Sequence, residues 1–298
     1  MILEYLQPNP DPWDAIAVVV RAGYNFAGLS AAGLALYLAA FADRLAPDAR
    51  AATIRMAAGF AIAGLALSVL SLFVRAGQLA GGGDPFDAVI WQAIARGRVG
   101  DAFGLRALGL ALVLSWLAPA RVAAVLAPIG ALLIAASYAG MGHSTLYRPR
   151  QELSVLVALH LLAVAYWIGG LLPMIDAARR NDAGLIRAWA RGAAVAVGVM
   201  IATGGGLIFY LVGRLDLLIA AWHGWALIAK LAFVAAALGL AIRHKLAATP
   251  ALARGEPGAG AALARSIGRE LAVVILVCYA AAELVSVHPL DYGHRIAS

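Results

Sequence analysis

Charged residues are scarce in this 298-residue chain. Asp, Glu, Lys and Arg make up 13% of it, against roughly 25% in a typical soluble protein. Hydrophobic residues make up 63%, and the mean hydropathy is +0.85. This composition excludes a water-soluble globular protein, so most of the chain must lie in lipid, where each helical span needs about 20 apolar residues.

Cysteine is almost absent, because Cys278 is the only one in the chain. A single cysteine excludes a disulfide framework and any CxxC metal or redox motif. The sequence also lacks a GxxxxGK[ST] motif, the phosphate-binding loop of nucleotide-driven motors. The basic residues are scattered between apolar segments and form no stripe, which argues against a nucleic-acid partner.

Long apolar segments fill the rest of the sequence. Eight of them, bounded by Pro, Gly and charged residues, lie near residues 15–41, 56–80, 103–118, 121–141, 153–175, 190–213, 223–246 and 266–288. We therefore predict an all-α fold, a polytopic membrane helix bundle of about eight transmembrane helices in a single membrane domain spanning residues 1–298.

The connections between these segments carry three further predictions. Pro119 predicts a tight turn between the third and fourth helices. Residues 81–101 form the longest connection and hold apolar residues at helical spacing, which indicates a short helix on the membrane surface. Residues 249–264 are rich in Pro, Ala and Gly and are predicted to be a linker.

The distribution of Lys and Arg predicts the orientation. The connections after the first, third, fifth and seventh helices hold thirteen basic residues, and those on the other side hold six. Because cytoplasmic loops carry the excess, both termini are expected to face outward, toward the periplasm of a bacterium. Nine acidic residues share that outer side, which favours the approach of a cation.

Histidines gather on the predicted outer side. His143, His223 and His288 lie at outer helix ends, and His160 lies within a span, roughly 10 Å below the outer boundary at 1.5 Å per residue. Imidazole binds copper, zinc and iron. Met141 adds a thioether, which favours Cu(I). These residues are candidate metal ligands, although histidines at helix ends can also simply face water.

Ionisable residues within spans are a second set of candidates, because charges in lipid are costly. Glu283 lies about 7 Å below His288 at that rise per residue and could be a metal ligand or a proton acceptor. The alternative is an ion pair with Lys230 or Arg21. His244 is the one histidine predicted on the cytoplasmic side.

Small residues indicate close packing. Gly169 and Gly170, and the run Thr203-Gly204-Gly205-Gly206, permit two helices to approach closely or a span to bend. Arg106 is predicted either to stabilise the bundle as a hydrogen-bond donor or to extend its charged end toward the membrane interface.

Several motifs together resemble one family. The segment His160-Leu-Leu-Ala-Val-Ala-Tyr-Trp-Ile-Gly-Gly-Leu-Leu-Pro173 resembles the signature of the copper resistance protein D family, which are bacterial inner-membrane proteins. Gly142-His143 and Thr203-Gly204 are similar to further family motifs, and Glu270 lies in a segment similar to its last helix. The resemblance covers residues 102–298, is most specific from residue 140 onward, and is weaker over 1–101. His223 departs from it, because a tyrosine is expected there.

The resemblance implies copper handling at the outer face, with uptake or delivery from the periplasmic side. His160 is the first candidate ligand and His143 the second. The implied cargo is copper, as Cu(I) or Cu(II), a periplasmic copper chaperone is a candidate partner, and no enzymatic activity is expected.

Two alternatives stay open at this stage. A haem b-binding redox protein linked to quinone would use two of the outer-side histidines, His143, His160, His223 and His288, as axial ligands. A protein that assists assembly of a copper enzyme is the other alternative. The sequence leaves the oligomeric state open.

Overall fold

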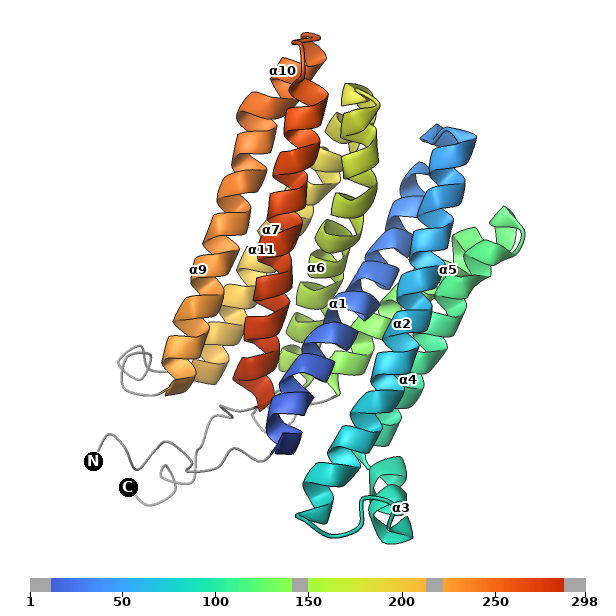
Figure 1. Ribbon diagram of the computed structural model, residues 1–298, viewed down its shortest axis with the longest axis vertical. Coiled ribbons are helices and arrows are strands. Elements are labelled where there is room, and N and C mark those ends of the chain that lie inside the picture. The colour runs from blue at the N-terminus through green and yellow to red at the C-terminus, as the bar shows by residue number, and fades with distance from the viewer. Residues whose placement is uncertain (1–11, 141–149, 213–221, 287–298) are drawn as a thin grey trace.

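The computed structural model describes residues 12–140, 150–212 and 222–286, and its regular structure there is helical (Figure 1). The long helices are α1 (Pro12–Phe41), α2 (Pro47–Ala80), α4 (Arg98–Val113), α5 (Ala120–Ala139), α6 (Arg150–Arg179), α7 (Ala183–Val212), α9 (Trp222–Arg243) and α11 (Ala259–Ser286). The short ones are α3 (Ala88–Arg96), α10 (Thr249–Ala253), the 3-10 turns η2 (Ala42–Arg44) and η3 (Leu114–Leu117), and the π-helical segment η5 (His244–Ala248).

Seven helical segments of the described chain are long and apolar enough to cross a membrane. They are Pro12–Arg44, Pro47–Ala80, Arg98–Leu117, Ala120–Ala139, Gln151–Arg179, Ala183–Tyr210 and Gly224–Ala253. The protein is therefore a polytopic helical membrane protein, which confirms the predicted class. These segments match the first seven of the eight predicted spans.

The eighth predicted span falls on α11, a helix of 28 residues. Its charged side chains, Arg265, Arg269, Glu270 and Glu283, separate it from the seven segments that qualify by composition. That α11 crosses the membrane remains a prediction, as does the periplasmic position of both termini.

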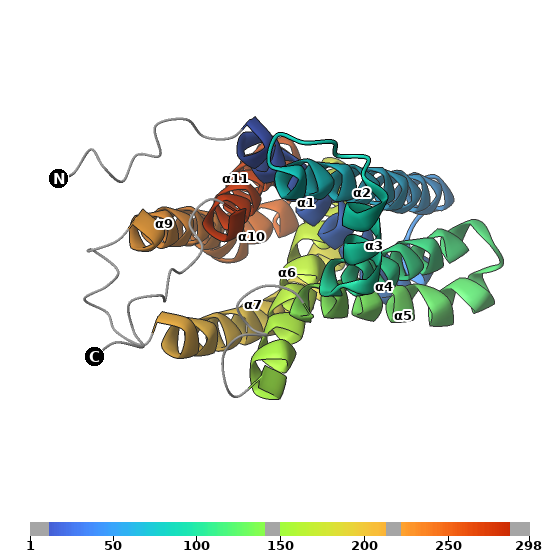
Figure 2. The same cartoon turned by 90° about the horizontal axis from the view of Figure 1, so that it is seen from below.

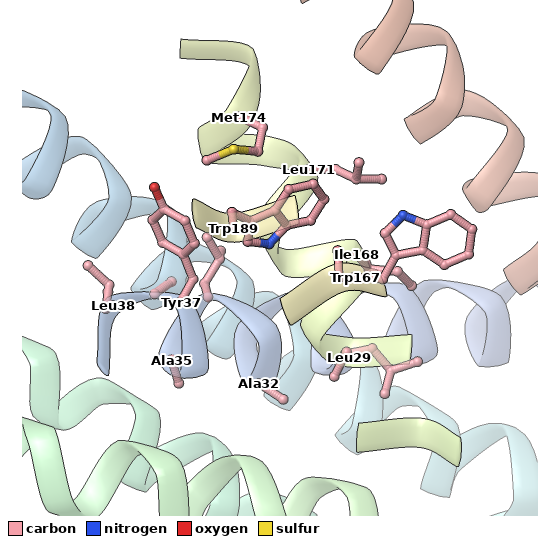
Figure 3. Close-up of a cluster of buried hydrophobic side chains, with 14 of the residues drawn as sticks. Leu29, Ala32, Ala35, Tyr37, Leu38, Trp167, Ile168, Leu171, Met174 and Trp189 are labelled. Carbon is pink, nitrogen blue, oxygen red and sulfur yellow. The ribbon is translucent and has the colours of Figure 1, made fainter. Parts of the chain in front are cut away.

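Helix α1 lies at the centre of the bundle. It packs against α2 and α5 and also against α6 and α11, so it joins the two groups of helices seen in Figure 1. In the second group α7 packs against α6 and α9 packs against α11, an arrangement visible from below in Figure 2. The core is apolar: Tyr37 and Leu38 of α1 belong to one buried cluster with Ile168, Leu171 and Met174 of α6 (Figure 3).

Glycines allow α1 and α6 to touch through their backbones. A Cβ atom added to Gly33 would overlap the carbonyl oxygen of Ala165 and lie 2.8 Å from Cα of Gly169. One added to Gly169 would in turn overlap the backbone of Gly33, and Gly170 leaves room for the indole of Trp189. The close approach predicted from Gly169 and Gly170 is confirmed, and its partner on α1 is Gly33.

The connections bear out the predicted short helix and the predicted turn, while the position of that helix on the membrane surface stays a prediction. Residues 81–101 contain α3, whose first turn is capped by the Asp87 carboxylate accepting a 2.8 Å hydrogen bond from the Val89 amide. Ile94 of α3 is buried, whereas Val89 is 71% exposed. Pro119 separates α4 and η3 from α5, as predicted.

The predicted linker at 249–264 is wrong for most of its length. Helix α10 and the first turns of α11 occupy it, which agrees with the high helix propensity of alanine. Only a short turn interrupts the helices, where Gly255 and Gly258 adopt φ values of 72° and 75° that favour glycine.

Candidate functional site

His160 lies on α6 and turns its ring toward α7. Its side chain is partly buried, and its Nδ1 atom lies 3.1 Å from the carbonyl oxygen of Met200 and 3.2 Å from the hydroxyl oxygen of Thr203. Both neighbours are on α7, one helical turn apart. The ring is therefore held in one orientation between the two helices.

These two contacts define which ring nitrogen carries the hydrogen. A carbonyl oxygen can only accept a hydrogen bond, and the Thr203 hydroxyl donates its own hydrogen to the Val199 carbonyl oxygen at 2.6 Å. Both neighbours thus require a hydrogen on Nδ1. In the neutral ring the lone pair then belongs to Nε2, which has no hydrogen-bond partner among the described residues.

Thr203 and Gly204 form the surface of α7 against which this ring packs. A Cβ atom on Gly204 would lie 3.3 Å from Cε1 of His160, tighter than most real contacts. Glycine at this position therefore leaves the room that the imidazole occupies. The predicted role of the 203–206 run in close packing is confirmed at Gly204, and its role as a bend stays a prediction.

The structure does not test the rest of the predicted metal site. Met141, His143 and His288 lie outside the described residues, and His223 is the second residue of α9, with a side chain that is not described. Glu283 is on α11 and partly exposed, with no hydrogen bond or ion pair to His160. Over the described ranges, no three His, Cys, Asp or Glu side chains form a group able to hold a metal ion.

Arg106 stabilises the bundle, as predicted. It is 3% exposed, and its guanidinium carbon lies 4.4 Å from the ring centroids of both Tyr24 on α1 and Tyr138 on α5. Its Nε atom donates to the Ser137 hydroxyl at 3.3 Å. Desolvated cation–π contacts contribute about 2 kcal/mol each, so this residue ties α4 to α1 and α5.

A second polar site joins α6, η5 and α11, and sequence analysis missed it. Glu270 is 1% exposed. Its Oε1 accepts a 2.9 Å hydrogen bond from Nε1 of Trp167, and its Oε2 lies 3.0 Å from Nδ1 of His244. Nε2 of His244 lies 2.8 Å from the Ser266 hydroxyl. We call these four side chains the His244–Glu270 network.

Only part of this network has a local signal in the sequence. Ser266 and Glu270 are four residues apart on α11 and so share one helix face. His244 is 22 residues from Ser266, and Trp167 is 103 residues from Glu270. In Figure 3 the Trp167 indole lies beside Ile168, on the far side of the cluster from Tyr37.

Two protein-family models match this chain. One described as Copper resistance protein D matches residues 183–284, and one described as Copper resistance protein D-like, N-terminal domain, matches residues 12–148. Together they cover about four fifths of the chain and reach further toward the N-terminus than the sequence motifs indicated. No curated protein and no solved structure gives a significant match.

Proposed function

Since this chain belongs to the copper resistance protein D family, a family of membrane proteins linked to copper resistance, we propose that it binds a copper ion through His160 and carries it inward from the periplasmic side. It would do so in the bacterial inner membrane, without catalysing a reaction. The proposed donor is a periplasmic copper chaperone. The predicted outer side is acidic, so it attracts the copper cation that the chaperone delivers.

The observation that carries this proposal is the tautomer and orientation of the His160 ring. Histidines that ligate metals usually donate a hydrogen from the other ring nitrogen to a carbonyl or carboxylate, which fixes the tautomer and directs the lone pair at the metal. His160 has this arrangement, with Nδ1 held by Met200 and Thr203 and Nε2 without a partner among the described residues. Its neutral imidazole is a suitable ligand for copper.

The further ligands of this copper site are proposed from the sequence. His143, His223 and His288 are predicted at the same end of the bundle as His160, with Met141 and Glu283 close by. Imidazole and thioether ligands together favour Cu(I). Copper is the cargo in this proposal, so the site has to release it as well as bind it.

Metal analysis of the purified protein, combined with its visible spectrum, tests the proposal. We expect copper to bind with a stoichiometry of about one per chain, and Cu(I)-loaded protein to be colourless. A strong Soret band in the protein as purified would instead support the haem alternative. Protein that binds neither copper nor haem would contradict both.

Thr203→Val provides a finer test of how the ring is held. Valine keeps the shape of threonine but removes the oxygen that accepts from Nδ1 of His160, so we expect the copper(I) affinity to fall by about 10-fold. Competition titration against a chromogenic Cu(I) chelator measures this. Thr203→Ser keeps the oxygen and should bind as the wild type does; equal affinities for all three proteins would show that Thr203 does not orient the ligand.

A further inference from the structure

The His244–Glu270 network holds a buried carboxylate and an imidazole that the proposed copper site does not use. We propose that it is a reversible proton-binding site.

The hydrogen bonds allow two protonation states. The two oxygens of Glu270 accept from Nε1 of Trp167 and from Nδ1 of His244, so the carboxylate is fully paired when ionised. Ser266 can donate its hydroxyl hydrogen to a lone pair on Nε2 of His244, or rotate and accept a hydrogen from it. The network therefore takes up a proton at Nε2 without losing a hydrogen bond.

The charge balance of this step is simple. A proton from water converts the His244 imidazole to imidazolium, and the net charge of the His244 and Glu270 side chains changes from −1 to 0. In this state the imidazolium and the carboxylate form a hydrogen-bonded ion pair at 3.0 Å. Loss of the proton leaves one negative charge, which the hydrogen bond from Trp167 helps to stabilise.

A groove leads to the network from one side. Ser266 lines an open groove together with Arg243 and Glu256, and the His244 side chain is 12% exposed. Glu270 lies behind them, almost fully buried. A proton therefore enters and leaves through the serine and histidine, while the carboxylate stays out of water.

The backbone at His244 is irregular. His244 begins η5, a π-helical segment inserted between α9 and α10. Such segments are rare and occur frequently at functional sites. The histidine of the network thus stands at the irregular junction between α9 and α10.

Charged groups surround the network, and basic residues prevail among them. At this end of the packed elements the titratable and charged groups include Asp176, Arg179 and Arg180 at the end of α6, Arg243 and Lys245 beside His244, Arg265 and Arg269 on α11, Arg254 and Glu256 after α10, and Tyr37 on α1.

Trp167 makes proton binding observable, because its indole donates directly to Glu270. We expect the tryptophan fluorescence of the full-length protein in detergent, without copper, to show a one-proton transition as the pH is varied. The transition should vanish in His244→Gln, which keeps a donor for Glu270 but does not titrate, and in Glu270→Gln. Trp167→Phe should lose the optical signal and still take up the proton, as measured with a pH indicator in weak buffer.

Glu256→Gln is the matched control, because this carboxylate is exposed and pairs with Arg254 at the same end of the bundle. It should leave the transition unchanged. A wild type without a transition, or a transition that persists in His244→Gln, would overturn the proton site. Size-exclusion profiles identify any variant that fails to fold. If Glu270→Gln does not fold, the result for His244→Gln alone tests the proton site.

Discussion

Gly33→Ala should destabilise the folded protein by at least about 3 kcal/mol, the upper range for overpacking a filled core. The added methyl group would overlap the carbonyl oxygen of Ala165 on α6. Backbone atoms cannot rotate away as the end of a side chain can, so α1 and α6 must separate. Because α1 also packs against α2, α5 and α11, this separation disturbs the centre of the bundle. Thermal unfolding in detergent, followed by circular dichroism, measures the loss.

Gly59→Ala is the control for this experiment. Gly59 lies in α2, is exposed, and would place its new methyl group with nothing within 4 Å. Alanine has the higher helix propensity, by up to about 1 kcal/mol, so this variant should be as stable as the wild type or slightly more so. Gly169→Ala should resemble Gly33→Ala. Equal melting temperatures for Gly33→Ala and Gly59→Ala would contradict the backbone contact between α1 and α6.

His160→Gln should lower the copper(I) affinity by at least about 100-fold. Replacing residues that only orient a ligand lowers metal affinity by about 10- to 100-fold, and here the ligand itself is removed. Glutamine has a similar size and keeps an amide that can donate to the Met200 carbonyl oxygen, so the α6–α7 contact should persist. Chelator competition on the purified variant measures the affinity, with its melting temperature recorded alongside.

His244→Gln is the control for this experiment. It shows whether copper affinity depends on His160 in particular or falls when any histidine is replaced. Both nitrogens of His244 already contact Glu270 and Ser266, so it offers no lone pair to a metal. We expect this variant to bind copper as the wild type does. If His160→Gln retained wild-type affinity, the copper site would have to be built without this residue and the proposed function would lose its central observation.

The spans were predictable because lipid imposes a simple rule. A backbone that cannot bond to water must form a complete helix, and an apolar run of about 20 residues marks it. Pro119 and α3 followed from equally local signals. The 249–264 segment was misjudged because its Pro and Gly suggested a linker, whereas alanine extended the helices up to a turn at Gly255 and Gly258.

The candidate site was predictable only one residue at a time. His160 stood out because an imidazole inside a span is unusual. Nothing near it in the sequence indicated that Met200 and Thr203 hold Nδ1, because those residues belong to another helix. Gly169 likewise indicated a close approach without indicating that Gly33 was the partner.

The His244–Glu270 network shows the same division most clearly. Hydropathy and helical periodicity are properties of neighbouring residues, and they account for the class, the first seven spans and the unusual positions of single polar residues. Which distant side chains share a hydrogen bond depends on how each helix is rotated and tilted against the next. Packing between helices sets those angles, and it alone brings Trp167 and His244 to the carboxylate of Glu270.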